Sequence, residues 1–241
     1  NIDPDRPMVL AVSRYDIHKN QKTIIRAFKQ MKKDIGGGVH PLLVMVGNSA
    51  SDDPEGSVMY EEIRQEAGDD RDIRLLLNIE NNDEVVGSLL SICKVFVHIS
   101  TREGFGLVVT EAMWQQAPVI GSTVGGIVKQ VVDGKTGFLV DPMDTAAVVK
   151  NMKLILEDGK LGERLGREGK ERVRAHFLLP TMLKNELMIM RYHLEVDREP
   201  PPFRANEPTY SEIRSALFGR KKWPFSVTDM RRDIKKKARR S

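Results

Sequence analysis

The chain has 241 residues, of which 40% are hydrophobic and 30% are charged, and its formal net charge is +4. A chain of this length can bury at least one full hydrophobic core. Its single cysteine, Cys93, excludes an intramolecular disulfide, and the apolar neighbours of Cys93 predict a small buried side chain rather than a nucleophile. No apolar run approaches the roughly 18 residues of a membrane-spanning helix, and no signal-peptide pattern is present. These features predict a cytoplasmic protein that does not enter a membrane.

Short apolar segments alternate with segments of helical composition along the chain. Strands are predicted at Met8–Ser13, Pro41–Val46, Ile73–Leu76, Val95–Ile99 and Pro118–Gly121. Helices are predicted at Gln21–Lys33, Tyr60–Ala67, Asp83–Ile92, Leu107–Gln116 and Thr145–Glu157, with further helical segments at Lys160–Ala175 and Leu179–Glu195. Such alternation is typical of a parallel sheet with helices on both faces. The predicted fold class is therefore α/β, with a doubly wound, Rossmann-like parallel sheet.

Four loops follow predicted strands and should meet at one edge of this sheet. They comprise residues 14–19, 47–52, 78–81 and 103–106. Ligands of open α/β sheets bind outside the carboxyl ends of the strands. The loops therefore predict one binding crevice, built from segments that are far apart in the chain.

The segment 101–113, with the sequence TREGFGLVVTEAM, places a glycine turn between a predicted strand and a predicted helix. The turn consists of Gly104, Phe105, Gly106 and Leu107. Its N–H groups can bind phosphate oxygens, because the first N–H groups of a helix have no intrahelical partner. Glu103 precedes the turn, and the carboxylate of Glu111, two turns into the helix, can accept hydrogen bonds from vicinal hydroxyls. The pattern suits a sugar nucleotide, although solvated glutamates explain the spacing alone equally well.

A polar loop after the first predicted strand carries two cations, Arg14 and Lys19. Arginine offers a planar fork of donors and lysine a point charge. Fixed cations stabilise a departing diphosphate most strongly when its negative charge develops in the transition state. A solvated surface cation is the alternative for either residue taken alone.

Together these motifs resemble the retaining glycosyltransferases of family 4, which have the two-domain GT-B fold. Glu-Gly-Phe-Gly at 103–106 and Glu-Ala-Met at 111–113 are similar to the family's glutamate pair. The paired glycines Gly125 and Gly126 also match, and the segment Val131–Pro142 predicts a short β-hairpin-like element, as in the family. The resemblance covers roughly residues 5–195, and several of its runs are similar to the trehalose synthase branch. One departure is that Ile127-Val-Lys-Gln130 stands where many members carry a glutamate, so no role for that glutamate transfers.

The resemblance implies a function, which is transfer of glucose from a nucleoside diphosphate glucose to a sugar acceptor. The implied acceptor is C1 of free glucose, which gives α,α-trehalose with retention. The donor, a UDP, ADP or GDP conjugate, is a substrate, and no tightly bound cofactor is expected. Mg²⁺ is left open as a companion of the diphosphate, while the sequence contains no spacing of metal ligands.

The resemblance also implies residue roles. Arg14 and Lys19 would grip the diphosphate, Glu103 would fix the hexose, and these three form the expected catalytic set. Glu111 would bind the ribose hydroxyls, and the loop at Asn78 would seat the base, mainly through backbone groups. His98, at the end of the strand before Glu103, is either a satisfied core residue or a neighbour of the donor.

The expected organisation is a linker at residues 1–7, a donor-binding domain at 8–195 and a basic extension at 196–241. An N-terminal domain, which binds the acceptor in the family, is expected to be missing. From Arg220 to Ser241 ten Lys or Arg residues oppose two Asp residues. We expect this charged extension to be partly disordered or to dock on the missing domain. Nucleic-acid binding is not expected, because the extension has too few aromatic residues among its cations. A homodimer is left open.

Two alternatives stay open. A retaining trehalose phosphorylase would use the same cleft and bind inorganic phosphate in place of the nucleotide. A partner-binding module without catalysis would instead use the basic extension.

Overall fold

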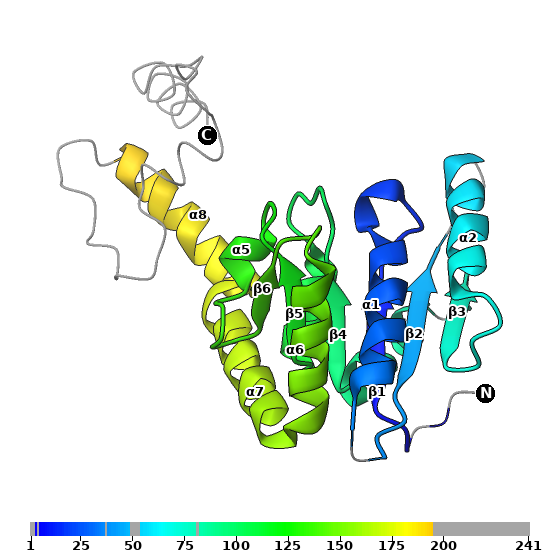
Figure 1. Cartoon of the computed structure of the whole chain (residues 1–241). Helices are drawn as coiled ribbons and strands as arrows, with labels where there is room; N and C mark the ends of the chain where they lie inside the picture. Colours follow the sequence, from blue (N-terminus) through cyan, green and yellow to red (C-terminus); the bar gives the residue numbers. More distant parts are fainter. Residues whose placement is uncertain (1–2, 4, 37, 49–53, 81, 195–241) are drawn as a thin grey trace. The chain divides into compact units, whose positions relative to one another are not determined.

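A computed structural model describes residues 3, 5–36, 38–48, 54–80 and 82–194 (Figure 1). The chain divides into two compact units, Asn1–Phe177 and Leu178–Ser241. The first unit contains the sheet, and the described part of the second contains helix α8 (Leu179–Leu194). The predicted boundaries at residues 7 and 195 stay predictions, and the basic extension lies outside the described residues.

The sheet of the first unit is entirely parallel, with the strand order β3-β2-β1-β4-β5-β6. Its strands are β1 (Met8–Val12), β2 (Leu42–Gly47), β3 (Ile73–Leu77), β4 (Val95–His98), β5 (Val119–Ser122) and β6 (Phe138–Val140). The central strands read as continuous apolar runs because both of their faces are buried. The direction of the strand order reverses between β1 and β4, where Val9 pairs with Val95. The predicted doubly wound, Rossmann-like fold is confirmed.

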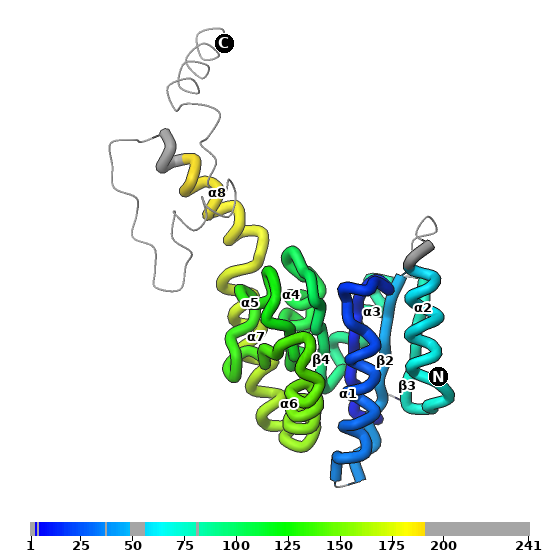
Figure 2. The backbone as a smooth tube through the Cα atoms, turned by 45° about the horizontal axis from the view of Figure 1, so that its top comes forward, coloured from blue at the N-terminus to red at the C-terminus, as the bar shows by residue number. Residues whose placement is uncertain are grey.

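Helices cover both faces of this sheet. On one face α1 (Gln21–Asp34) packs against α2 (Pro54–Ala67) and α6 (Thr145–Glu157). Figure 2 shows α3 (Asn82–Ile92) and α4 (Leu107–Trp114) behind the strands, away from α1 and α6. α7 (Gly159–His176) packs against α4 and α6, and a 3₁₀ turn, η1 (Ile17–Lys19), precedes α1.

The core between α1 and the sheet explains why this part of the sequence folds as it does. Ile24, Phe28 and Met31 are spaced as one helix face, and all are buried, at 2% exposure or less. Burial of each such side chain contributes about 1.5–3 kcal/mol. Cys93 is buried as predicted, and this burial raises the pKa of its thiol to about 12.

Two predictions differ from the structure. The hairpin-like prediction for Val131–Pro142 is wrong, because Phe138–Val140 pairs in parallel with β5. Within this segment only Asp133 and Gly137 form a bridge, whereas all three residues of β6 pair with β5, so the edge of β5 offers the segment the longer ladder. α2 begins at Pro54, six residues before the predicted start, and α5 (Ile127–Gln130) was not predicted.

None of the helices in the described part of the chain has the length and apolar character needed to cross a bilayer. The described residues also contain no group of three or more His, Cys, Asp or Glu side chains that could hold a metal ion.

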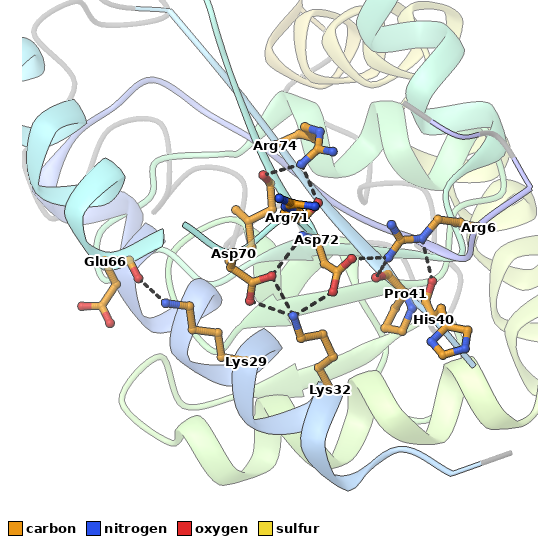
Figure 3. Close-up of polar contacts among 11 residues, drawn as sticks. Arg6, Lys29, Lys32, His40, Pro41, Glu66, Asp70, Arg71, Asp72 and Arg74 are labelled. Carbon is orange, nitrogen blue, oxygen red and sulfur yellow. Dashed lines mark hydrogen bonds and ion pairs between the residues drawn. The ribbon is translucent and has the colours of Figure 1, made fainter. Parts of the chain in front are cut away.

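A charge cluster ties α1 to the amino ends of β2 and β3 (Figure 3). Lys32 Nζ donates to Asp70 Oδ1 at 2.7 Å and to Asp72 Oδ2 at 2.8 Å. Arg6 Nη2 reaches the other oxygen of Asp72, Oδ1, at 2.7 Å and also donates to the Pro41 carbonyl oxygen. Burial is the largest single effect on Asp70 and raises its pKa, but the hydrogen bond and the charge of Lys32, together with the hydrogen bond from the Asp72 N–H, outweigh it, so the pKa falls. The bond from Lys32 likewise lowers the pKa of Asp72.

We expect this cluster to stabilise the fold above pH 4 and to lose that effect in acid. Both aspartates have a lower pKa when folded, so the unfolded chain binds more protons as the pH falls below about 4. Lys32→Met should therefore cost about 1 kcal/mol at pH 7 and much less at pH 3, as measured by urea unfolding. Lys33→Met is the control, since Lys33 is exposed and has no ion pair with any described residue. A cost of Lys32→Met that is independent of pH would contradict the assignment.

Candidate functional site

A cleft of about 750 Å³ opens at the carboxyl edge of the sheet, beside the point where the strand order reverses between β1 and β4. Its lining comes from the end of β1 and the η1 loop, the end of β2, helix α3, and the segment from Glu103 to Gln115. Segments far apart in the chain therefore form one site. Three of the four predicted loops, those at 14–19, 47–52 and 103–106, contribute residues to the lining, and the described residues of the loop at 78–81 do not.

Most of the predicted site residues line this cleft. They are Arg14, Lys19, Glu103, Phe105, Gly106, Leu107 and Glu111, together with His98. Gly104 and Asn78 are not part of the lining. Gly104 is exposed, and its carbonyl oxygen accepts a hydrogen bond from the N–H of Gly126. Asn78 follows β3 in a left-handed conformation with φ of 49°, and the start of α3 at Asn82 reaches the cleft instead.

Glu103 is the centre of a compact polar cluster. Its Oε2 lies 2.8 Å from Lys19 Nζ and 2.8 Å from His98 Nε2. Hydrogen bonding to His98 and the ion pair with Lys19 lower the pKa of Glu103 to about 2, against the opposing effect of burial. Because the ionised carboxylate only accepts hydrogen bonds, the proton in the contact with His98 belongs to Nε2. Glu103 is therefore a fixed negative charge at neutral pH.

The loop that carries Lys19 is held to the ends of two other strands. Asn20 has a left-handed backbone, with φ of 56°, and its amide donates to the Pro142 carbonyl oxygen at 2.7 Å. The N–H of Thr101 donates to the His18 carbonyl oxygen at 2.8 Å. These bonds fix the ammonium of Lys19 beside Glu103, although 84 positions separate the two residues.

Arg14 differs from Lys19 in its surroundings. Its backbone is held by Gln21, whose amide donates to the Arg14 carbonyl oxygen at 2.7 Å. Its side chain is exposed at the cleft and has no hydrogen bond or ion pair with any described residue. Arg14 therefore brings an uncompensated positive charge to the cleft, whereas the charge of Lys19 is balanced by Glu103.

The glycine turn lies against a second glycine turn, Gly125-Gly126. A Cβ on Gly125 would overlap the carbonyl oxygen of Glu103, and a Cβ on Gly126 would come within 2.7 Å of the Phe105 Cα. Only Gly125 has a positive φ, of 56°. Neither glycine lines the cleft. The pair therefore supports the loop that does, instead of facing a ligand itself.

Three further residues brace the same loop from behind. Gln130 is fully buried, and its amide donates to the Phe105 carbonyl oxygen. Arg172 Nε donates to the Gln130 carbonyl oxygen at 2.6 Å. The ring of Phe177, at the end of α7, meets the ring of Phe105 edge to face at 6.0 Å. α5 and α7 thus fix the position of the glycine turn.

Glu111 projects from α4 into the part of the cleft that α3 closes. Partial burial, together with the carboxylate of Asp83 on α3, raises its pKa. Gly106 is the N-cap residue of α4 and has a φ of 82°. Because glycine has no side chain, no N-cap side chain accepts a hydrogen bond from the first N–H groups of the helix.

The model of the family described as glycosyl transferases group 1 matches residues 1–172. The chain belongs to this family. Among its glycosyltransferase relatives, the trehalose synthase of Thermococcus litoralis is 36% identical over 191 residues, which are 79% of this chain and 45% of the relative. A trehalose phosphorylase of Pleurotus pulmonarius is 28% identical over 72% of this chain and 24% of its own length. The chain therefore spans about half the length, or less, of these relatives.

Solved glycosyltransferase structures share the fold. The sucrose-phosphate synthase of Thermosynechococcus elongatus matches with a TM-score of 0.69 and 30% identity, over 81% of this chain and 47% of that one. The Anabaena protein HepE, solved in complex with UDP-glucose, matches with a TM-score of 0.65 and 20% identity, over 78% and 49% of the two chains. At 20% identity the second match concerns the fold alone.

The bracing residues of this glycosyltransferase domain were missed by sequence reasoning. Gln130 was noted only as a departure from the family pattern. Arg172 and Phe177 carry no local signal of their bracing role, because Gln130 and Phe105, which they contact, lie 42 or more positions away. Of the three, only the Ile127-Val-Lys-Gln130 departure could have drawn attention, since a buried polar side chain requires a partner.

Proposed function

We propose that this chain is the donor-binding half of a retaining glycosyltransferase. The observation that carries the proposal is the meeting of Arg14, Lys19, Glu103 and Glu111 with a glycine turn in one cleft at the reversal of strand order. In a member of this family, such a set suits a nucleoside diphosphate hexose: cations for the diphosphate, one carboxylate for the hexose and another for the ribose. HepE, which shares the fold, was solved in complex with UDP-glucose, a donor of the proposed class.

The hexose we propose is glucose and the product α,α-trehalose, because the name of the 36% identical relative is trehalose synthase. In the proposed reaction the bond between glucose C1 and the diphosphate oxygen breaks, and the diphosphate keeps the electron pair. The acceptor hydroxyl forms the new bond on the same face, and its proton passes to the departing phosphate oxygen. A second domain, outside this chain, would supply the acceptor site.

The residues would divide this work. Arg14 would stabilise the charge that develops on the diphosphate, and the N–H groups of Gly106 and Leu107 would add hydrogen bonds. Glu103 would orient the hexose, while His98 and Lys19 hold its carboxylate in place. Glu111 would accept hydrogen bonds from the ribose hydroxyls, and it can still do so although its pKa is raised.

A retaining trehalose phosphorylase is the second candidate, because a trehalose phosphorylase is among the relatives. It would bind inorganic phosphate beside Arg14 and require no nucleotide. A module that binds partners through its basic extension would depend on residues outside the described part of the chain.

Calorimetric titration with UDP, ADP, GDP and their glucose conjugates tests the proposal and names the base. We expect one nucleotide series to bind, and Glu111→Ala to weaken its binding tenfold or more, because two hydrogen bonds to a charged group are lost. Glu163→Ala is the control, since Glu163 is exposed on α7 and does not line the cleft. Binding of inorganic phosphate without binding of any nucleotide would favour the phosphorylase.

A further inference from the structure

The cleft continues between two helices beyond the edge of the sheet. α3 lines it with Asp83, Val86, Gly87 and Leu90, which have the spacing of one helix face. α4 contributes Val108, Glu111 and Trp114 to the lining. Gly87 thus occupies the middle of a helix and the middle of a wall of the cleft.

A glycine in a helix interior destabilises the helix relative to alanine, so it requires an explanation. The interior glycines of α7 have one in packing. A Cβ on Gly166 would overlap the Gln116 carbonyl oxygen, and a Cβ on Gly169 would lie 3.4 Å from the Thr136 carbonyl oxygen. A Cβ on Gly87 would meet no atom of the described chain within 4 Å, and the backbone of Gly87 does not have a positive φ. Neither packing nor backbone conformation accounts for this glycine.

The remaining feature of Gly87 is its place on the cleft. The α3 wall contributes no cation to the lining, and it contributes the carboxylate of Asp83, which repels phosphate. The cations Arg14 and Lys19 stand on a different element, after β1. The part of the donor that would lie against the helix backbone beside Gly87 is therefore an uncharged ring rather than a phosphate.

We propose that Gly87 is a specificity-determining residue, whose missing side chain leaves room for the nucleoside of the donor, its ribose and base. The inference rests on the proposed function and deepens it. The size of the side chain at position 87 then sets how well a nucleoside fits against α3.

Two substitutions of different size test this proposal on the 241-residue chain. Gly87→Ala should raise the melting temperature by about 2–4 °C, because alanine favours the helix and has space there. The same change should weaken nucleotide binding. Gly87→Leu, titrated with UDP, ADP and GDP, should weaken the binding of the accepted nucleotide by about tenfold or more, because a bulky side chain then fills the ligand's space.

Ser88→Leu is the matched control. Ser88 is exposed on the same helix and does not line the cleft, so its replacement should leave nucleotide binding at the wild-type level. Unchanged binding in Gly87→Leu, or an equal loss in Ser88→Leu, overturns the role of Gly87 while the donor site stands. Absence of nucleotide binding in the wild type overturns the donor site and, with it, this inference.

Discussion

On the proposed function, replacing Arg14 with alanine is expected to lower the turnover number of a glycosyltransferase that contains this chain about a hundredfold or more. This is the scale of loss when one preorganised charge stabiliser is removed from an active site. The expectation follows from charge. The side chain of Arg14 reaches the cleft without any partner in the described chain, so its positive charge is available to the departing diphosphate.

Lys19 is expected to contribute less of this stabilisation than Arg14 does. Its ammonium lies 2.8 Å from Glu103 Oε2, and both side chains are largely buried, at 16% and 12% exposure. Lys19 therefore interacts with Glu103 before the reaction as well as during it, whether or not a donor is bound. An interaction accelerates the reaction only when it is stronger in the transition state than before it.

The measurement is steady-state kinetics on this chain together with the proposed acceptor domain, with Arg14→Ala compared with Arg14→Lys and Arg102→Ala. Arg14→Lys keeps the charge and loses the planar fork, so an intermediate rate is expected. Arg102 is exposed, near Glu103, and does not line the cleft, so its alanine variant should react at the wild-type rate. A turnover number for Arg14→Ala within a few-fold of wild type would remove Arg14 from the mechanism.

Much of the fold could be predicted because its signals are local. Five of the six strands are short, mainly apolar runs, of which four are almost wholly buried and β3 is mostly half-buried. Their predicted bounds agree with the structure to within one residue at each end. β6 was not predicted as a strand of the sheet, because the segment Val131–Pro142 was expected to form a hairpin-like element, as in the family that it resembles. Its parallel partner, β5, lies on the far side of α5, and no short-range pattern points to it.

The site divides in the same way. The glycine turn and its two glutamates lie within thirteen residues, so the sequence alone could indicate them. The bonds that hold this turn, directly or through α5, join residues 22 to 43 positions apart, such as Gly126 to Gly104 and Arg172 to Lys129. Such contacts are a consequence of packing between α5, α7 and the loop, and helical periodicity does not reveal them.

Substitution of the paired glycines should show how strongly that packing controls the site. Gly125→Ala combines two penalties, a positive φ of 56° and an overlap of the new Cβ with the Glu103 carbonyl oxygen. Gly126→Ala isolates the second, since Gly126 has φ of −69° and its Cβ would meet backbone atoms of Phe105 and Gly104 at 2.7–2.8 Å. Backbone cannot rotate away as a side chain can, so the loop must move.

We expect Gly126→Ala to cost about 3 kcal/mol of unfolding free energy and to weaken nucleotide binding at least tenfold, with a larger loss for Gly125→Ala. Gly134→Ala is the control for backbone conformation alone. Gly134 has φ of 69° and open space around its Cβ, so alanine there should cost about 1–2 kcal/mol and leave binding unchanged. Urea unfolding and nucleotide titration on the three variants separate the two effects. If Gly126→Ala lost no more binding than Gly134→Ala, Glu103 and the glycine turn would owe their placement to Gln130 and Phe177 and not to the paired glycines.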